Sequence, residues 1–310
     1  MTTLTLMVGL PACGKTTYTK TKIDSRTKIL SSDDIRKELF GFEENQENND
    51  LIFKTLYSRA RNFLIQGKDV LIDATNCNVE NRKKALSNFE NLNIRRKAIV
   101  IENPIEICIK QDSSRRRVVG EKVIREFAET FSYPTREEGF DEIVIIKSTE
   151  DGFVRYLKTT LLFIIKDDKI LLAKKKRGFG AGLLNGAGGK VEPYESEDNA
   201  AVRETQEEFK ITPLNLNKRA EIELDEYVNG EHAIVNMSIF TATDYEGAPT
   251  ESNEMEPVWF DLNKIPYTRM FPDDGYWLPE VLKGNYVTGT FKYDINLNIL
   301  DHKIEIKSNN

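Results

Sequence analysis

Eight residues near the start of the chain leave few options for the fold around them. The segment from Gly9 to Thr16, GLPACGKT, fits the pattern GxxxxGK[ST] and directly follows an apolar run. Glycines at this spacing let backbone N–H groups turn inward around an anion at the start of a helix. The pattern therefore predicts a strand, a phosphate-binding loop and a helix, in that order. A plain glycine turn is the alternative.

The residue types in this loop suit a nucleoside triphosphate. Lys15 is expected to reach the β- and γ-phosphate oxygens of ATP, and the Thr16 hydroxyl is expected to hold Mg²⁺. The expected ATP-binding residues are Gly9, Leu10, Pro11, Ala12, Cys13, Gly14, Lys15, Thr16 and Thr17.

Polar residues follow two further expected strands, at the edge where parallel sheets collect ligands. After KIL, Asp33 is a candidate to accept the proton of an attacking hydroxyl or to bind metal, and Arg36 could meet a phosphate. The alternative is that Ser32 or Asp33 simply caps a helix. At the end of DVLIDATN, three residues are expected to bind metal through water or to orient an acceptor: Asp73, Thr75 and Asn76.

An arginine run is expected at the start of a helix over 118–131. Arg115, Arg116 and Arg117 could form a lid that neutralises the charge of a transferring phosphoryl group. A solvated basic run is the alternative.

The order of elements changes near the middle of the chain. Strands alternate with helices expected at 15–24, 33–40, 48–67, 79–91 and 118–131, which predicts an α/β domain over residues 1–150. After STEDG the pattern becomes a hairpin through Asp167-Asp168, further strands and one helix at 197–209. This predicts a second, α+β domain over residues 151–310.

The 197–209 helix carries a second motif. Glu204, Glu207 and Glu208 stand at i, i+3 and i+4, so their carboxylates share one face. Like charges this close are stable together when a cation binds between them, and hard oxygen ligands suit Mg²⁺ or Mn²⁺. Arg203 is expected to hold Glu195. A solvated acidic helix is the alternative.

Composition limits the remaining options. Three cysteines without metal-type spacing and only two histidines favour free thiols in a reducing cytoplasm, with no zinc site. No apolar run approaches the roughly 20 residues of a membrane span. Residues 1–150 hold 25 Lys+Arg against 23 Asp+Glu, and the remainder 19 against 27. Neither half is basic enough to coat long nucleic acid, so a strand end or a mononucleotide is the easier substrate.

Residues 1–147 resemble the 5′-hydroxyl polynucleotide kinase branch of phosphate-loop kinases, through GLPACGKT, SSDDIR and DATN. The resemblance implies that Asp33 is the general base, that Arg36 contacts the acceptor phosphate, and that one of Arg115–Arg117 is the lid arginine. The motifs after the loop are shared with kinases of nucleosides and modified nucleotides, so the acceptor stays open.

The segment that starts at Gly189, with five residues before Glu195 and seven more before Arg203, fits the Nudix box, GX5EX7REUXEEXGU. Residues from about 157 to 306 are similar to the animal-type oxidised-purine nucleoside triphosphate diphosphatases. The shared segments are KKRGFGAG, GGKV, ESNEM, PDDGYW and GTFKYD. The resemblance implies an α/β/α sandwich. Thr205 and Lys210 depart from the box, where an apolar residue and glycine are usual, at a small expected cost in packing and helix capping.

This second resemblance also implies a set of site residues. Gly188 would join Glu204, Glu207 and Glu208 as metal ligands, and Glu254 would support the metal or the attacking water. The implied nucleotide-binding residues are Thr160, Lys175, Phe179, Asn185, Phe271, Asp273 and Asp274. Phe271 stands where the family has tryptophan. Adjacent buried carboxyls such as Asp273-Asp274 cannot both ionise cheaply, so one is expected to be protonated and to read the base as a donor. An ordinary PDDG turn is the alternative.

Together these patterns predict a bifunctional enzyme. One site would transfer the ATP γ-phosphate to a 5′-hydroxyl, and the other would hydrolyse oxidised purine triphosphates such as 8-oxo-dGTP with Mg²⁺. The expected partners are ATP, purine dNTPs and nucleic-acid 5′ ends. The alternatives are a nucleoside, nucleotide or modified-base kinase fused to a general dNTP pyrophosphohydrolase, and a non-enzymatic nucleotide sensor.

Overall fold

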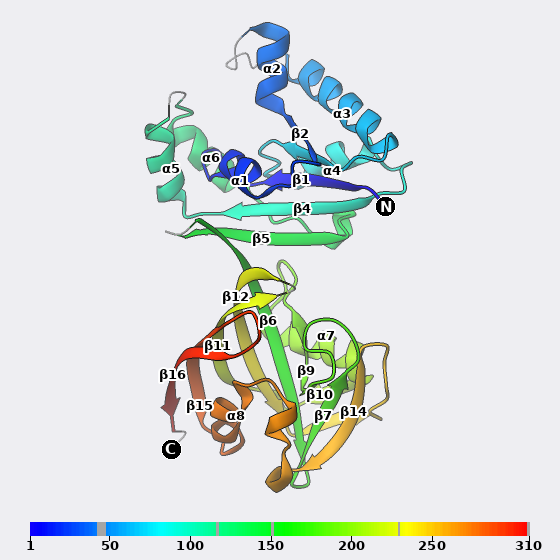
Figure 1. The fold of residues 1–310 in the computed structure, drawn as a ribbon, viewed down its shortest axis with the longest axis vertical. Helices are drawn as coiled ribbons and strands as arrows, with labels where there is room; N and C mark the ends of the chain where they lie inside the picture. Colours follow the sequence, from blue (N-terminus) through cyan, green and yellow to red (C-terminus); the bar gives the residue numbers. More distant parts are fainter. Residues whose placement is uncertain (42–47, 116–117, 150–151, 229, 309–310) are drawn as a thin grey trace. The chain divides into compact units, whose positions relative to one another are not determined.

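The chain divides into two compact units, Met1–Val154 and Arg155–Asn310. The computed structural model describes residues 1–41, 48–115, 118–149, 152–228 and 230–308. Figure 1 shows the elements of both units, coloured along the sequence.

The first unit is built on a parallel sheet with the order β5-β4-β1-β3-β2. Its strands are β1 (Thr3–Val8), β2 (Lys28–Ser31), β3 (Val70–Asp73), β4 (Arg95–Glu102) and β5 (Glu142–Thr149). The central strands β1 and β3 are mostly apolar, and nearly all of their side chains are buried because helices cover both faces of the sheet.

Helices cover both faces of this sheet, which confirms the predicted α/β class. They are α1 (Lys15–Lys22), α2 (Ser32–Phe40), α3 (Asn49–Ile65), α4 (Val79–Ser87), α5 (Ile105–Ser113), α6 (Glu121–Glu129) and the short η1 (Arg136–Glu138). One core cluster joins Leu6 to residues of α3 and α4, and another joins Met7 to residues of α5 and α6.

Helix α5 was not predicted from the sequence. Ile105, Ile107 and Ile109 alternate as strand residues do, but Ile105, Cys108 and Ile109 pack into the core while Ile107 is 42% exposed. That spacing is helical, and only the contact with the sheet distinguishes the two patterns.

The second unit has a mixed sheet with the order β16-β15-β11-β12-β6, onto which shorter strands pair. Its strands are β6 (Gly152–Lys166), β7 (Lys169–Lys175), β8 (Leu184–Asn185), β9 (Ala187–Lys190), β10 (Ile211–Leu214), β11 (Asn217–Val228), β12 (Glu231–Ala242), β13 (Asp244–Gly247), β14 (Met255–Asp261), β15 (Tyr286–Tyr293) and β16 (Ile299–Lys307). The predicted hairpin joins β6 to β7 through Asp167 and Asp168, both at positive φ, as a two-residue hairpin turn requires.

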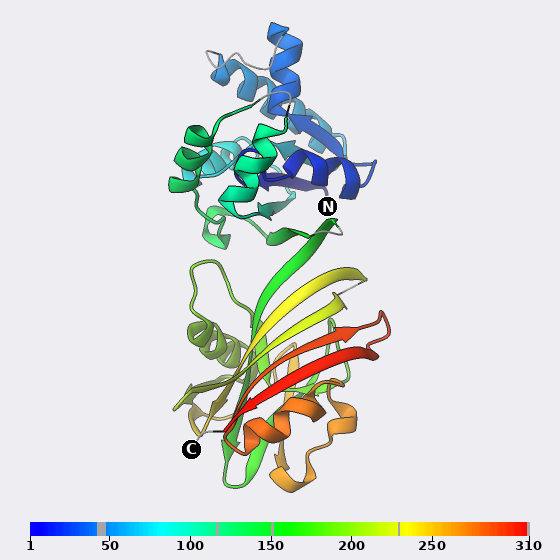
Figure 2. The same ribbon diagram turned by 90° about the vertical axis from the view of Figure 1, so that its left-hand side faces the viewer.

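The two long helices of this unit, α7 (Glu197–Phe209) and α8 (Asp274–Leu282), lie on opposite sides of its sheet (Figure 2). Two short turns, η2 (Leu262–Lys264) and η3 (Tyr267–Arg269), precede α8. Helix α7 contributes Ala201 and Phe209 to one core cluster, and α8 contributes Trp277 and Leu278 to the other. The α/β/α sandwich is therefore confirmed.

The PDDG segment is not an isolated turn. Asp273 already has helical dihedral angles and Asp274 begins α8, an element that the sequence did not predict. The helix contains Pro279, which lowers helix propensity, and it is stabilised by the buried Trp277.

All three cysteines, Cys13, Cys77 and Cys108, are buried free thiols. Within the described ranges, no helix has both the length and the apolar character needed to span a bilayer.

Candidate functional site

The first site is the loop between β1 and α1. Gly9 has φ 148° and Gly14 has φ 99°, and Gly14 is the N-cap of α1. A Cβ at Gly9 would lie 2.7 Å from both the Cys13 Sγ and the Ile101 carbonyl oxygen. Glycine is therefore required at both positions, by space at Gly9 and by backbone conformation at Gly14.

Lys15 folds back across this loop. Its Nζ donates to the carbonyls of Gly9 at 2.8 Å and Leu10 at 2.7 Å, and it lies 3.7 Å from the Cys13 Sγ. The side chain is buried, so its charge is compensated by the loop carbonyls. An anionic phosphate would be a stronger partner for this ammonium than neutral carbonyl oxygens are.

Thr16 and Asp73 meet beside the loop. The Thr16 Oγ1 donates to the Asp73 Oδ2 at 3.0 Å, although the two residues are 57 positions apart. Burial raises the pKa of Asp73, the charge of Lys15 and the Thr16 hydrogen bond lower it, and the charges of Asp33 and Asp34 raise it further. The hydroxyl and carboxylate therefore form a polar pair of the kind that binds Mg²⁺.

Helix α2 supplies Asp33 and Arg36. The N-cap is Ser31, whose Oγ accepts from the Asp33 and Asp34 amides, so the expected cap at Ser32 or Asp33 is wrong. Instead, Asp33 accepts from the Arg36 Nη1 at 2.5 Å, and the Arg36 Nη2 donates to the Asn49 Oδ1 at 3.0 Å.

The Asp33–Arg36 pair is asymmetric in its exposure. The Asp33 side chain is 53% exposed and that of Arg36 only 6%. The buried Arg36 Nε has no hydrogen-bond partner among the described residues. Arg36 therefore keeps donor capacity beside a carboxylate that solvent can reach.

Thr75 and Asn76 support the loop through backbone contacts. The Thr75 carbonyl accepts from the Gly9 amide at 3.0 Å, and the Asn76 Nδ2 donates to the Met7 carbonyl at 2.8 Å. The Asn76 backbone is left-handed, with φ 46°. These contacts show the two residues positioning the loop, whereas an acceptor-binding role for them stays a prediction.

These side chains line a cleft of about 1270 Å³ within the first unit. Its far wall includes apolar residues, among them Phe53, Val119 and Phe127, and Arg115 also lines it. Arg115 follows α5, and its amide donates to the Asp112 carbonyl, so it does not start the next helix as expected. Arg116 and Arg117 lie outside the described residues.

The second site is built on α7, which spans the predicted residues. Ser196 caps its N-terminus, and Lys210 ends it in the left-handed conformation with φ 62°. Thr205 is fully buried, and its hydroxyl donates to the Ala201 carbonyl at 2.7 Å. Both departures from the motif are therefore accommodated, with a satisfied hydroxyl and a strained C-cap.

Arg203 organises the carboxylates around this helix. Its Nε and Nη2 donate to both oxygens of Glu195 at 2.8 and 2.9 Å, as the sequence predicted. Its Nη1 donates to Glu204 at 2.7 Å, and its Nη2 also reaches the Lys190 carbonyl. The Arg203 hydrogen bond lowers the pKa of Glu195, whereas burial raises that of Glu204 against the effect of Arg203.

Two glycines of strand β9 allow its backbone to approach these carboxylates and β6 closely. A Cβ at Gly189 would lie 2.4 Å from the Glu204 carboxylate, and one at Gly188 would lie 2.2 Å from the Thr160 carbonyl oxygen. The Gly188 amide donates to the Glu208 Oε2 at 2.9 Å. Burial, with the charges of Glu204 and Glu254, raises the pKa of Glu208 to about 8, against the Gly188 bond and Lys175.

Not all three glutamates of the predicted metal site are buried together. Glu208 is 6% exposed and the Glu204 side chain 15%, but the Glu207 side chain is 61% exposed and lies 3.7 Å from Arg203. Among the residues that the structure describes, no three metal-ligating side chains are clustered. The Glu204–Glu208 pair still fits a divalent cation. Burial raises the pKa of both carboxyls because it disfavours their charged forms, and a bound cation would offset that cost.

The residues expected around the base come from several loops. The rings of Phe179 and Phe271 lie 5.8 Å apart, with Phe271 directly over Gly180. The Asn185 Oδ1 accepts from the Gly186 amide. The buried Thr160 Oγ1 lacks a hydrogen-bond partner among the described residues, which leaves it available to a ligand. Glu254 pairs with Arg177.

Asp273 and Asp274 are both buried but differ in their partners. Asp273 accepts from the Trp277 Nε1 at 2.9 Å and the Tyr293 hydroxyl at 2.6 Å. Asp274 accepts from the Phe271 amide at 3.0 Å. Burial, followed by the charge of Asp273, raises the pKa of Asp274 well above its usual value, and burial also raises the pKa of Asp273.

Sequence reasoning missed Glu226, on β11. It is 5% exposed, and burial together with the charge of Asp273 raises its pKa to about 7. The sequence pattern could have revealed it. Glu226 continues the every-second-residue spacing of Ala220, Ile222 and Leu224, which places it on the inward face of the strand.

Two family models match the chain, one described as an AAA domain over residues 4–134 and one as a NUDIX domain over residues 155–281. The chain is 42% identical over 146 residues to the oxidized purine nucleoside triphosphate hydrolase of Danio rerio, covering 47% of this chain and 92% of that protein. It is 40% identical over 145 residues to the protein of that name from Mus musculus, with the same coverage. Among solved structures, the MutT protein of Bacillus halodurans is 25% identical, with a TM-score of 0.44, and the match covers 48% of this chain and 97% of that one.

Proposed function

Through residues 155–281 this chain belongs to the Nudix hydrolases, and we propose that its C-terminal unit hydrolyses oxidised purine nucleoside triphosphates to the monophosphate and pyrophosphate. The observation that carries the proposal is the Glu204–Glu208 pair on α7, in which Arg203 donates to Glu204 and the Gly188 amide of β9 donates to Glu208. Relatives named for this activity, matched over nearly their whole length, support the substrate class.

The chemistry follows from the charges at this site. Glu204 and Glu208 would hold Mg²⁺ or Mn²⁺, which supplies charge neutralisation at the phosphates when bound. Lys175, whose positive charge lowers the pKa of Glu208, would bind the triphosphate. Water attacks a phosphorus atom of the α–β anhydride, its proton passes to a carboxylate of the site, and the bridging P–O bond breaks. Glu208 and Glu254 are the candidate proton acceptors.

Pyrophosphate release tests this proposal. The full chain should turn over 8-oxo-dGTP faster than dGTP with Mg²⁺, and Glu208→Gln should lower the rate by at least 100-fold. The matched control is Glu256→Gln, on β14 outside the site, with activity unchanged. Equal rates for the two nucleotides would support a general dNTP pyrophosphohydrolase instead. A full chain that releases no pyrophosphate from any purine triphosphate would refute the proposal.

We propose a second activity for the N-terminal unit, transfer of the ATP γ-phosphate to a 5′-hydroxyl. It is supported by the cleft that Lys15, Thr16 and the solvent-accessible carboxylate of Asp33 all line. The acceptor hydroxyl would attack the γ-phosphorus, its proton would pass to Asp33, and the bond to ADP would break. Arg36, whose buried Nε has no hydrogen-bond partner among the described residues, would bind a phosphate of the acceptor.

The acceptor is tested by following transfer of labelled γ-phosphate. A 5′-hydroxyl oligonucleotide should be labelled, and Asp33→Asn should lower the rate by 100-fold or more, whereas Asp34→Asn on the same helix turn should not. Labelling of nucleosides or nucleotides alone would overturn the polynucleotide acceptor. If both wild-type activities are absent while both nucleotides bind, the chain is a nucleotide sensor.

A further inference from the structure

Glu226 is a buried residue whose carboxyl has no hydrogen-bond or ion-pair partner among the residues that the structure describes. It follows Ala220, Ile222 and Leu224 on the face of β11 that packs against α8, and it is 5% exposed. No hydrogen bond or ion pair reaches its carboxyl from any residue within the described ranges. An unpaired carboxyl in such a place costs free energy, so a ligand is a physical reason for its presence.

The neighbours of Glu226 are those that line the expected base site. Asp225 pairs with Lys292, so Glu226 and Tyr293 are the next residues on the adjacent strands β11 and β15. The Tyr293 hydroxyl donates to Asp273, whose charge raises the pKa of Glu226. Asp274 follows Asp273 and is equally buried. Glu226 and Asp273 are therefore neighbours on the α8 side of the sheet, and Asp274 is the next residue after Asp273.

The hydrogen-bonding capacity left in this cluster is unevenly distributed. Both oxygens of Asp273 accept from protein donors, Trp277 and Tyr293, whereas Asp274 uses one oxygen and Glu226 neither. In the same row of the sheet, Arg155 flanks Ala233, which lies opposite Glu226; its Nη1 pairs with Glu231 at 3.4 Å, and its buried Nε has no hydrogen-bond partner among the described residues. Asp274 and Glu226 are therefore the two carboxyl groups with capacity to bind a ligand.

We propose that Glu226 is a specificity-determining residue that, together with Asp274, hydrogen-bonds the guanine-type edge of a purine nucleotide. This rests on the proposed hydrolase function for its substrate class. A guanine-type edge presents a ring N–H and an exocyclic amino group as donors, beside one carbonyl acceptor. An ionised carboxylate accepts from the two donors, and a protonated carboxyl donates to the carbonyl.

One carboxylate and one protonated carboxyl would match this edge better than they would match the alternatives. An adenine-type edge presents one amino donor beside a bare ring nitrogen, so at least one acceptor of the pair would be left unpaired. Leaving a buried acceptor unpaired is what produces strong discrimination between otherwise similar substrates. The pair therefore selects guanine and 8-oxoguanine, which have the same donor edge.

The experiment compares Glu226→Leu and Glu226→Gln with wild type, on 8-oxo-dGTP, dGTP and dITP, which lacks the exocyclic amino group. Glu226→Leu should lower kcat/KM for the two guanine nucleotides about 10- to 100-fold, the range for a lost hydrogen bond to a charged group. The loss for dITP should be several-fold smaller, and Glu226→Gln should lie between wild type and Glu226→Leu.

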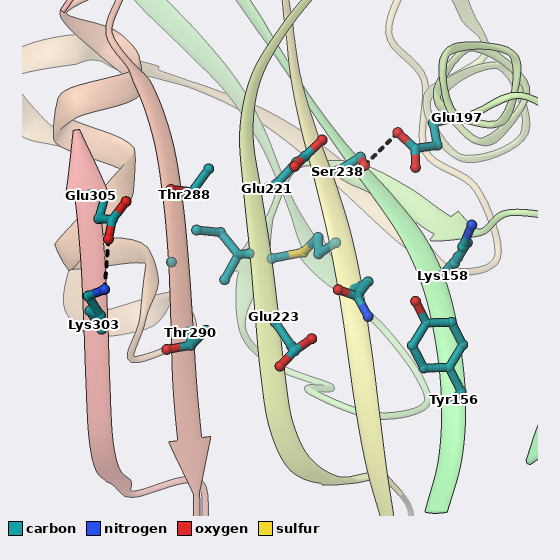
Figure 3. Close-up of a pocket in the computed structure, with 14 residues that line it drawn as sticks. Tyr156, Lys158, Glu197, Glu221, Glu223, Ser238, Thr288, Thr290, Lys303 and Glu305 are labelled. Carbon is teal, nitrogen blue, oxygen red and sulfur yellow. Dashed lines mark hydrogen bonds and ion pairs between the residues drawn. The ribbon is translucent and has the colours of Figure 1, made fainter. Parts of the chain in front are cut away.

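The control is Glu223→Leu, on the same strand. Glu223 lies on the opposite face of the sheet, in the open groove of Figure 3 beside Glu221, Lys303 and Glu305, and its replacement should leave the nucleotide preference unchanged. If the role of Glu226 were purely structural, its replacement would lower the Tm. Because leucine removes an unpaired buried carboxyl, Glu226→Leu should keep or raise the Tm while it lowers kcat/KM.

Binding of the monophosphate products separates this inference from the proposed reaction. The Kd of 8-oxo-dGMP and dGMP should rise by the same 10- to 100-fold in Glu226→Leu, whether or not the triphosphate is hydrolysed. If hydrolysis is absent but this effect is present, the proposed function fails and the base site stands. An unchanged guanine-to-hypoxanthine ratio in both assays, or an equal loss for all nucleotides with a lowered Tm, would overturn the inference.

Discussion

Replacing Glu208 with glutamine should stabilise the metal-free C-terminal unit near neutral pH. Burial raises the pKa of this carboxyl from 4.5 to about 8, so the folded state holds a proton that the unfolded chain releases. The free energy of unfolding of wild type should therefore fall as pH rises from about 4.5 to about 8. Glutamine cannot ionise, and its amide oxygen can still accept from the Gly188 amide.

The size of the effect follows from the shift. At pH 7, about 2.5 units above its unfolded pKa, the carboxyl is ionised in the unfolded chain and mostly protonated in the folded one. At 1.36 kcal/mol per unit, this predicts that Glu208→Gln is more stable than wild type by about 3 kcal/mol. Above pH 8 the difference should level off near 5 kcal/mol, and near pH 4 it should vanish. Mg²⁺ should stabilise wild type, and Glu208→Gln much less, because the cation binds the ionised folded site.

The assay is urea unfolding followed by tryptophan fluorescence. Both tryptophans of the chain, Trp259 and Trp277, lie in the C-terminal unit, so the signal reports that unit alone. Glu207→Gln is the matched control, since its side chain is 61% exposed and surface changes usually stay within about 0.5 kcal/mol. A stability difference between wild type and Glu208→Gln that does not change between pH 5 and pH 8 would refute the reasoning.

Three further outcomes are expected. Gly189→Ala should abolish pyrophosphate release while leaving kinase activity intact, because the new Cβ would lie 2.4 Å from the Glu204 carboxylate; a fully active variant would contradict this. Lys15→Ala should lower phosphoryl transfer at least 100-fold with pyrophosphate release unchanged, as two separate assays on one preparation would show. Arg82→Met should destabilise the N-terminal unit by about 3–5 kcal/mol, since it leaves Glu138 buried and unpaired; circular dichroism should detect this and tryptophan fluorescence should not.

Features that depend on a few neighbouring residues could be predicted from the sequence more reliably than features that depend on distant contacts. The glycine spacing around Lys15 and the Arg203–Glu195 pair could be predicted, because loop and helix geometry fix them over a few residues. The cap at Ser31 was missed by one or two positions, since several polar residues in SSDD can cap the same helix. Helix α5 was missed because its isoleucines imitate the period of a strand.

By itself, the sequence determined the two folds and the chemical character of each site, because hydrophobic periodicity and motif spacing are short-range properties of the chain. The tertiary structure decided which of those groups are buried together. It brings Asp73 to Thr16 across 57 residues and Asp273 to the Tyr293 hydroxyl, and it buries Glu226 without a partner among the described residues. The hydration and the charges around a carboxyl depend on which strands and helices pack over it. Those non-local contacts, and the pKa values that follow from them, arise only when the sheet has formed.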